Sequence, residues 1–310
     1  MMQQPKIAIL LATYNGDRFL SAQLDSILAQ SYGNYVLVVR DDCSSDATFT
    51  ILQRYLAAHP TKICLLPADA TNLGASGSFS CLLNHVLEHK HKLGLEHAYM
   101  MFCDQDDVWH EHKIGIEVEA MLKAEAGNPQ IPVLVHSDLE VVSESLTLIA
   151  PSFTRYQGLE IQRNQFNNIV ISNLVTGCTA LINEALAWQA CPVSRQAIMH
   201  DWWLALVASA FGKLVYLDTP LVRYRQHGSN TIGAKEHAKL PVLNLSLWQR
   251  IFTRKPNEHL FEVARQARAF LQQYGNRLSL RQRIGLRVSG VMKVRIGILQ
   301  RLSFRLARRF

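Results

Sequence analysis

The feature that most constrains the fold is a repeated pattern in which a short apolar run ends abruptly in polar residues. The runs at residues 7–12, 35–39 and 98–102 end at a turn or at clustered aspartates, and helix-like stretches separate them. Strands that alternate with helices predict a mostly parallel sheet flanked by helices on both faces. Ligands of such sheets bind beyond the carboxyl ends of the strands, where these polar clusters fall. We therefore expect an α/β fold with its functional site at that edge.

The alternation continues along the chain and then gives way to a different composition. We expect helices at residues 21–30, 48–58, 79–89 and 201–211, and further strands at 63–66, 133–136, 174–182 and 213–217. From about residue 243 the chain becomes rich in arginine, with the spacing of an amphipathic helix. The expected organisation is an α/β domain at residues 1–240 and a basic helical tail at residues 241–310.

Three carboxylates, Asp104, Asp106 and Asp107, lie within four positions at an expected strand end. Crowded carboxylates repel one another unless a cation lies among them. Mg²⁺ and Mn²⁺ take oxygen ligands of this kind and leave coordination positions open for a diphosphate. The alternative is an acidic turn that only faces solvent, and the residues alone leave both interpretations open.

A second acidic cluster, at residues 41–46, follows the strand expected at 35–39. Asp46 precedes a helical stretch and is expected to cap it. Asp41 and Asp42 come before that cap, at the end of the strand, where a carboxylate can accept a hydrogen bond from the N–H of a nucleotide base.

Four motifs follow one another in a fixed order along the first part of the chain. They are Ala12-Thr13-Tyr14-Asn15-Gly16, Asp41-Asp42-x-Ser44-x-Asp46, Asn72-x-Gly74 and Asp104-x-Asp106-Asp107. As an ordered set they resemble the family 2 glycosyltransferases with the GT-A fold, which are inverting enzymes that use nucleotide-sugar donors. The resemblance covers about residues 5–232.

Later segments extend the resemblance. Residues 200–203, His-Asp-Trp-Trp, are similar to the acidic pair that supplies the family's general base, with His200 in place of the usual glutamate. Residues 223–230 are similar to a segment whose histidine, here His227, closes over the metal and the diphosphate. With His136-Ser137-Asp138-Leu139 and Thr176-Gly177-Cys178-Thr179, these segments resemble the branch of bacterial rhamnosyltransferases that assemble surface polysaccharides.

The resemblance implies a single displacement at an anomeric carbon, with a role for each matched residue. Asp201 is the implied catalytic base. The implied donor-binding residues are Ala12, Thr13, Tyr14, Asp42 (at the base), Asn72, Gly74 and Asp104 (at the ribose). The implied ligands of Mg²⁺ or Mn²⁺ are Asp106, Asp107 and His227. Without the resemblance, Asp201 would be interpreted as a carboxylate that stabilises a helix N-terminus, and His227 as a surface histidine. Whether His227 contacts the metal or the diphosphate stays open.

The formal net charge of +7 is unevenly distributed. Residues 250–310 hold 15 Lys and Arg against two acidic residues, a net of +13, which leaves −6 for residues 1–249. On a helical wheel of residues 284–306 the apolar side chains lie mostly opposite the arginines, although interspersed glycines weaken the helix. Such a segment suits an anionic membrane surface. The alternative is a helical appendage whose apolar side packs on the acidic body.

Donor, acceptor and compartment are expectations of the same resemblance. We expect dTDP-rhamnose as first choice of donor, a UDP-sugar as second, and a glycan acceptor on a lipid carrier. Six cysteines without a C-x-x-C pair indicate reduced thiols, and the first apolar run is too short for a signal peptide. We therefore expect a cytoplasmic protein, peripheral on the inner face of the cytoplasmic membrane.

Three rival functions each fit part of the sequence. A processive polysaccharide synthase would carry a Gln-x-x-Arg-Trp segment and membrane spans, and neither is found in the sequence. A nucleic-acid-binding protein would interleave aromatic residues with the basic ones, yet only Phe304 and Phe310 follow Tyr274, so we expect no nucleic-acid partner. A glycan-binding protein without activity is the third alternative, and the aspartates described above argue against it.

Overall fold

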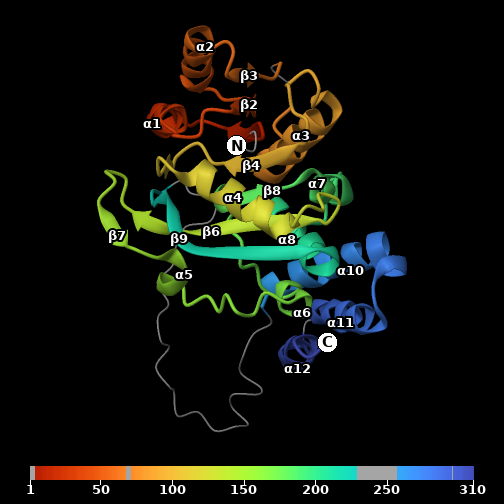
Figure 1. The fold of residues 1–310 in the computed structure, drawn as a ribbon. Coiled ribbons are helices and arrows are strands. Elements are labelled where there is room, and N and C mark those ends of the chain that lie inside the picture. The colour runs from red at the N-terminus through yellow and green to blue at the C-terminus, as the bar shows by residue number, and fades with distance from the viewer. Residues whose placement is uncertain (1–3, 68–70, 229–256, 295) are drawn as a thin grey trace.

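A single sheet forms the centre of the computed structural model, which describes residues 4–67, 71–228, 257–294 and 296–310 (Figure 1). Its strands are β1 (Ile7–Thr13), β2 (Tyr35–Asp41), β3 (Ile63–Leu65), β4 (Tyr99–Cys103), β5 (Val108–Trp109), β6 (Val133–Val142), β7 (Leu148–Ala150), β8 (Ala180–Ile182) and β9 (Lys213–Arg225). Their order is β3-β2-β1-β4-β8-β6-β9-β5, with β7 paired to β6. The strands from β3 to β4 are parallel, β8 is antiparallel to both of its neighbours, and β6 and β9 are again parallel.

Helices cover both faces of this sheet. They are α1 (Asp17–Leu28), α2 (Thr48–Ala58), α3 (Gly74–His89), α4 (Lys113–Glu125), the short α5 (Phe153–Tyr156) and α6 (Phe166–Ile169), α7 (Glu184–Ala190) and α8 (His200–Phe211). Because side chains alternate along a strand, β1 directs Ile7, Ile9 and Leu11 to the face covered by α1 and α4. Ala8 and Leu10 point to the other face, which α3, α7 and α8 cover. The expected α/β architecture is confirmed.

One expected strand is mostly irregular. The sequence predicts a strand over residues 174–182, but only Ala180–Ile182 pair with the sheet, and Gly177–Thr179 form a 3₁₀ turn. Both the N–H (3.0 Å) and the hydroxyl (2.7 Å) of Thr179 donate to the carbonyl of Thr176, which closes the turn. This turn lies at the end of β4, directly beside the acidic residues that follow that strand.

Strand β9 is much longer than the expected strand at residues 213–217. It pairs with β6 from Val133↔Lys213 to Val142↔Arg225, and the register shifts where Asp138 pairs with Pro220 instead of the next residue in line. The irregularity accommodates a proline within the strand, since proline cannot donate a ladder hydrogen bond. The extension carries Arg225 to the edge of the sheet where the acidic residues lie.

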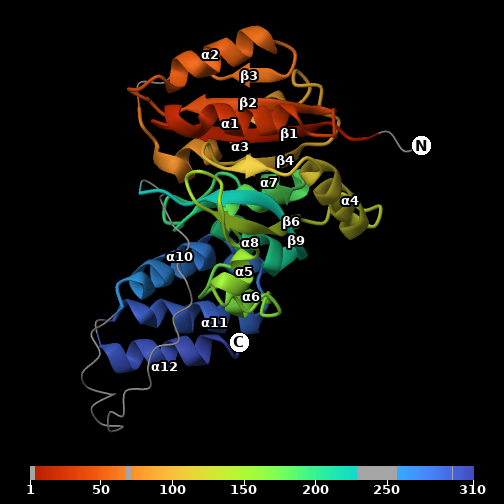
Figure 2. The same ribbon diagram turned by 90° about the vertical axis from the view of Figure 1, so that its left-hand side faces the viewer.

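Three tail helices, α10 (His259–Tyr274), α11 (Leu280–Gly290) and α12 (Gly297–Ala307), stack below the sheet on the side away from α2 (Figure 2). The ring of Phe270 in α10 packs 5.4 Å from Trp203 of α8, and Val263 and Ala264 are fully buried beside it. The tail therefore shares the hydrophobic core on one face of the sheet. The expected boundary between residues 240 and 241 lies outside the described residues.

The amphipathic pattern of the tail is divided between packing and exposure. Met292 is buried and Val288 packs against the core, whereas Leu299, Leu302 and Leu306 of α12 are exposed by 40%, 49% and 45%. Within the described residues, no helix is both long enough and apolar enough to cross a membrane.

Candidate active site

The carboxyl ends of β1 and β2 form one side of the site. Thr13 and Asp41 are register partners, and the Thr13 hydroxyl donates to Asp41 Oδ1 at 2.8 Å. Ser44 donates to the same carboxylate through its hydroxyl (2.6 Å) and its N–H (3.0 Å). Asp41 therefore ties the two strand ends together and fixes the backbone that carries Thr13 and the half-buried Ala12.

Asp42 points into the protein and holds the start of α3. Its carboxylate accepts the backbone N–H groups of Leu73 (2.8 and 3.0 Å) and Gly74 (2.8 Å), and the Arg40 guanidinium at 3.1 Å. Asn72 donates its side-chain N–H to the Asp42 carbonyl at 2.9 Å, and Gly74 has a φ of +68°, which favours glycine. The structure thus brings Asp42, Asn72 and Gly74 together. The Asp42 carboxylate binds the backbone of the turn that contains Asn72 and Gly74.

Tyr14 is fixed by a residue that sequence reasoning did not single out. Its N–H donates to Gln105 Oε1 at 2.8 Å, and Gln105 Nε2 donates to its carbonyl at 2.9 Å. A Cβ on Gly16 would lie 2.2 Å from Gln105 Oε1, so any larger residue here would displace the Gln105 amide from Tyr14. The Tyr14 side chain is half exposed. Gly16 was the one feature of the sequence here that could have indicated the close approach of another chain segment.

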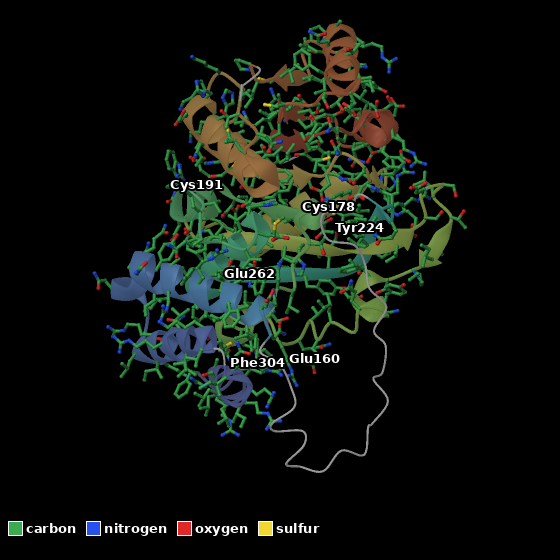
Figure 3. All side chains as sticks on the ribbon, turned by 180° about the vertical axis from the view of Figure 1, so that it is seen from behind. Glu160, Cys178, Cys191, Tyr224, Glu262 and Phe304 are labelled. Carbon is green, nitrogen blue, oxygen red and sulfur yellow. The ribbon has the colours of Figure 1, made fainter. Side chains whose placement is uncertain are left out.

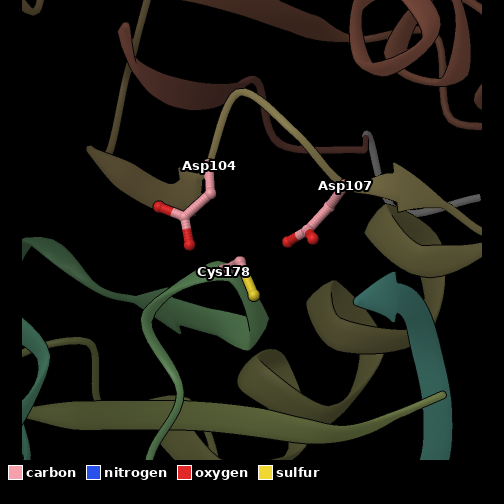
Figure 4. A group of neighbouring side chains, drawn as sticks. All are labelled: Asp104, Asp107 and Cys178. Atoms are coloured by element: carbon pink, nitrogen blue, oxygen red, sulfur yellow. The ribbon is translucent and has the colours of Figure 1, made fainter. Parts of the chain in front are cut away.

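The carboxylates of the segment after β4 point in two different directions. Asp106 Oδ2 lies 2.8 Å from His227 Nε2. Asp107 is fully buried, and its Oδ1 accepts the backbone N–H of Arg225 at 3.0 Å, while Arg225 Nε donates to the Asp106 carbonyl at 2.7 Å. Asp106 and His227 are thus brought together, whereas the Asp107 carboxylate turns toward Asp104 (Figure 4).

Asp104, Asp107 and Cys178 form a compact group whose ligand atoms all lie within 4.8 Å of one another (Figure 4). Burial raises the pKa of Asp104 to about 7, with further contributions from the charges of Asp106 and Asp201. Burial, and then the charges of Asp106 and Asp104, also raise the pKa of Asp107 well above its usual range. Buried carboxylates this close cannot all ionise unless a cation compensates them, so this corner of the site favours a positive ion.

An aromatic ring of α1 supports the segment that carries His227. The Phe19 ring centre lies 4.8 Å from that of His227 and 4.6 Å from the Arg225 guanidinium carbon. A guanidinium over an aromatic face is attracted by the ring quadrupole. No sequence spacing could have indicated this contact, because Phe19 and His227 lie at opposite ends of the domain sequence.

Asp201 lies in the first turn of α8, where the helix N-terminus favours a negative charge. Burial nevertheless raises the pKa of Asp201 to about 6, against hydrogen bonds from the backbone of Trp202 and Gly177 and from the Asn173 side chain that lower it. The charge of Asp201 also contributes to the raised pKa of Asp104, so the two carboxylates share one electrostatic environment. Asn173 was not predicted from the sequence.

His200, which stands where the family's usual glutamate is expected, is held in an apolar position. Its ring packs 4.2 Å from that of Phe79 and 5.0 Å from that of Phe102. Burial lowers the pKa of His200 to about 3, so the imidazole is neutral at physiological pH. A Cβ on Gly177 would lie 3.2 Å from His200 Nε2 and 3.6 Å from Asp201 Oδ2, which leaves little room for a side chain between them.

The side chains present fit a divalent cation. Asp106 and His227 offer a carboxylate and an imidazole at mutual hydrogen-bond distance, and both are ligand types that Mn²⁺ accepts. Asp107 Oδ2 is buried and accepts no N–H or O–H hydrogen bond from any group in the described part of the chain. A buried carboxylate oxygen without such a donor is what a site built for a cation contains.

Comparison with known proteins identifies a family and several relatives. The family model described as Glycosyl transferase family 2 matches residues 8–187. The dTDP-rhamnosyl transferase RfbG of Shigella flexneri is 26% identical over 254 residues, which cover 79% of this chain and 81% of the relative. The Escherichia coli protein WfgD, named UDP-Glc:alpha-D-GlcNAc-diphosphoundecaprenol beta-1,3-glucosyltransferase, is 30% identical over 118 residues, or 38% of this chain and 41% of the relative.

A solved structure shares the fold. The mannosyltransferase PcManGT from Pyrobaculum calidifontis, in complex with GDP-Man and Mn²⁺, superposes with a TM-score of 0.55 at 15% identity, covering 99% of this chain and 74% of that chain. This likeness supports the GT-A architecture expected from the ordered motifs. The family model covers more than half of the 310 residues and includes every acidic motif up to Asp107. The chain therefore belongs to glycosyl transferase family 2 and is a glycosyltransferase.

Proposed function

We propose that this glycosyltransferase transfers a sugar from a nucleotide diphosphate to a hydroxyl of a lipid-linked glycan, with inversion, in cell-surface polysaccharide assembly. Rhamnose from dTDP-rhamnose is the first choice of donor and a UDP-sugar the second. The names of the relatives support this, since one is a dTDP-rhamnosyl transferase and another acts on a diphosphoundecaprenol-linked sugar. The observation that carries the proposal is the convergence of four carboxylates, Asp104, Asp106, Asp107 and Asp201, at one edge of the sheet.

The donor would bind along the loops after β1, β2 and β4. The backbone around Ala12, Thr13 and Tyr14 would complete the donor pocket. Asp42 keeps the turn at Asn72 and Gly74 in position, and direct contact of Asp42 with the base is part of the proposal. Asp104 would accept hydrogen bonds from the ribose.

Asp106 and His227 would hold Mg²⁺ or Mn²⁺, with Asp107 completing the negative charge around it. When bound, the cation supplies Lewis-acid stabilisation of the charge that develops on the departing diphosphate. Asp106 is held for this task by His227 on its side chain and by Arg225 on its carbonyl.

Asp201 would act as the base. With a pKa of about 6 it is a carboxylate at neutral pH and basic enough to take a proton. The acceptor hydroxyl would transfer its proton to Asp201 as its oxygen bonds to the anomeric carbon, and the bond from that carbon to the diphosphate would break on the opposite side. A positioned base of this kind contributes about 10²–10⁴-fold.

We also propose that the C-terminal part of the tail, residues 280–310, rests on the anionic inner face of the cytoplasmic membrane. Leu299, Leu302 and Leu306 are exposed on α12, whose helix also carries Arg301 and Arg305. Exposed apolar side chains beside basic ones suit a membrane interface, where each basic residue contributes about 1 kcal/mol. Arg308, by contrast, is engaged within the protein. Its guanidinium lies 3.5 Å from the Glu160 carboxylate and 5.9 Å from the centre of the Phe304 ring; Figure 3 labels Glu160 and Phe304.

A thermal-shift screen of nucleotide sugars with Mn²⁺ or Mg²⁺ tests the proposal, because a ligand that binds the folded state raises its stability by RT ln(1 + [L]/Kd). We expect dTDP-rhamnose with Mn²⁺ to give the largest shift, and Asp106→Ala to lose the metal-dependent part of it. Glu119→Ala, an exposed acidic position on α4, is the matched control and should keep the full shift. The absence of any shift with every nucleotide sugar and metal would contradict the proposal.

A further inference from the structure

The thiol of Cys178 lies beneath the acidic segment that follows β4. Cys178 belongs to the 3₁₀ turn Gly177–Thr179, and β8, which continues from that turn, pairs antiparallel with β4 through Met101↔Leu181. This pairing sets the turn against the end of β4, where Asp104 begins the acidic segment. The carboxylates of Asp104 and Asp107 and the thiol of Cys178 face one another in Figure 4.

The three groups present a coordination site with mixed oxygen and sulfur ligands. Their ligand atoms lie within 4.8 Å of one another, and small side-chain rotations bring such atoms to the bond lengths of about 2.0–2.3 Å that Zn²⁺ makes with carboxylate oxygen and thiolate sulfur. Asp107 and Cys178 are fully buried, so the packing around them holds both in place.

The second oxygen of Asp107, noted above as buried without an N–H or O–H donor, indicates apart from the grouping of the ligand atoms that a cation belongs here. Asp107 Oδ1 accepts the N–H of Arg225, but the buried Oδ2 accepts no N–H or O–H hydrogen bond within the described residues, and the group beside it is the weakly donating thiol of Cys178. An unsatisfied buried carboxylate oxygen is costly, and a cation is the partner that compensates it most fully.

We propose that Asp104, Asp107 and Cys178 bind a thiophilic divalent cation such as Zn²⁺ or Cd²⁺. The cation displaces the thiol proton to solvent and bonds to the thiolate, with no change of oxidation state. Mg²⁺ prefers oxygen ligands, so the sulfur atom discriminates against it and in favour of softer ions. The position shares Asp107 with the proposed Mg²⁺ or Mn²⁺ site but does not use Asp106 or His227, whose ligand atoms point to each other.

The consequence for activity rests on the proposed function. A cation held by Asp104 removes that carboxylate from the ribose of a nucleotide sugar. Zn²⁺ would therefore oppose donor binding even when Mn²⁺ is in excess, and the residue responsible for this sensitivity is Cys178. The inhibition is reversible by a chelator because only metal–ligand bonds form, to the two carboxylates and the thiolate.

Co²⁺ titration tests the site directly, since a cobalt–thiolate bond gives a charge-transfer absorption in the near ultraviolet. In the full-length protein we expect this band to saturate at one equivalent of Co²⁺. The band should be retained in Cys191→Ser and lost in both Cys178→Ser and Cys178→Ala. Loss of an outer-shell partner alone weakens metal binding about 10–100-fold, so Asp107→Asn should weaken Co²⁺ binding at least about tenfold. A band that persists in Cys178→Ser, or no band in the unmodified protein, would overturn the proposal.

A second experiment tests the inhibition by Zn²⁺ and measures nucleotide binding. In the presence of Mn²⁺, the Zn²⁺ concentration that halves dTDP-sugar binding should rise at least about tenfold in Cys178→Ser relative to Cys191→Ser. Equal Zn²⁺ sensitivity of the two variants would refute the inhibitory role. If the cobalt band appears but no nucleotide sugar binds under any condition, the metal site stands and the proposed function fails, so the two outcomes are separable.

Discussion

At the scale of single residues, Asp201 illustrates how burial and helix position act against each other. The N-terminus of α8 favours its negative charge, while the apolar surroundings raise its pKa to about 6. The folded protein therefore binds the Asp201 proton more tightly than the unfolded chain does. Stability from this group is greatest below the unfolded value of 3.8 and declines as the pH rises through about 6.

Replacing Asp201 with Asn is accordingly expected to separate activity from stability. Transfer should fall by about 10²–10⁴-fold because no base remains, while nucleotide binding changes little. The melting temperature at pH 7.5 should rise relative to the unmodified protein, and this advantage should vanish at pH 4, where Asp201 is protonated. Calorimetry at both pH values, together with a transfer assay, measures both effects.

The exposed Asp218→Asn serves as the control and should alter neither property. In the unmodified enzyme, transfer should decline about tenfold per pH unit below pH 6. Near-normal transfer by Asp201→Asn would show that another group is the base.

Residues whose chemistry follows from local sequence could be assigned before the structure, and residues that act through long-range contacts could not. The clustered aspartates predicted that Asp104, Asp106 and Asp107 lie together after a strand, but not that Asp107 turns toward Cys178. Gln105 and Phe19 act through segments far away in the chain, so their roles depend on the fold. The roles of these aspartates in donor binding, metal ligation and base catalysis, with those of Asp42, His227 and Asp201, stay predictions.

At the scale of elements, apolar periodicity located the parallel strands because they are buried on both faces and continuously apolar. It underestimated β9, since Asp218 and Pro220 interrupt the apolar pattern there, yet β6 continues the pairing past them with a shift of register. It overestimated the strand before β8 because Gly177–Thr179 is apolar enough to resemble a strand but folds as a turn. Local composition indicates which residues are buried, whereas the ends of a strand depend on how far its partner strand continues the pairing.

The helix α12 carries the prediction that tests membrane contact. Leu302→Glu places a negative charge on its exposed apolar side and should reduce pelleting with vesicles that contain anionic lipid several-fold. Leu122→Glu on α4 is the matched control, since Leu122 is 40% exposed and lies outside the tail. Pelleting should fall with added salt for the unmodified protein and the control. Equal pelleting of both variants at every salt concentration would exclude α12 as the contact.

At the scale of the whole molecule, the tail is part of the hydrophobic core. Phe270 of α10 is fully buried against Trp203, so Phe270→Ala should destabilise the protein by about 3–5 kcal/mol in urea unfolding. Phe304→Ala, at a partly buried position of α12, should have a smaller effect. A single cooperative transition is expected for the unmodified protein. An unchanged midpoint in Phe270→Ala would mean that the tail folds independently of the sheet.

The packing of α8 between the acidic edge and the tail has a geometric consequence. Its first turn carries Asp201, and Trp203, only two residues further along, contacts Phe270 of α10. With the tail resting on a bilayer as proposed, the height of the base above the lipid headgroups is therefore set by rigid packing and not by a linker. Such an enzyme would select its acceptor by length. The hydroxyl that reacts would be the one that a lipid-linked glycan places at the height of Asp201 above the membrane.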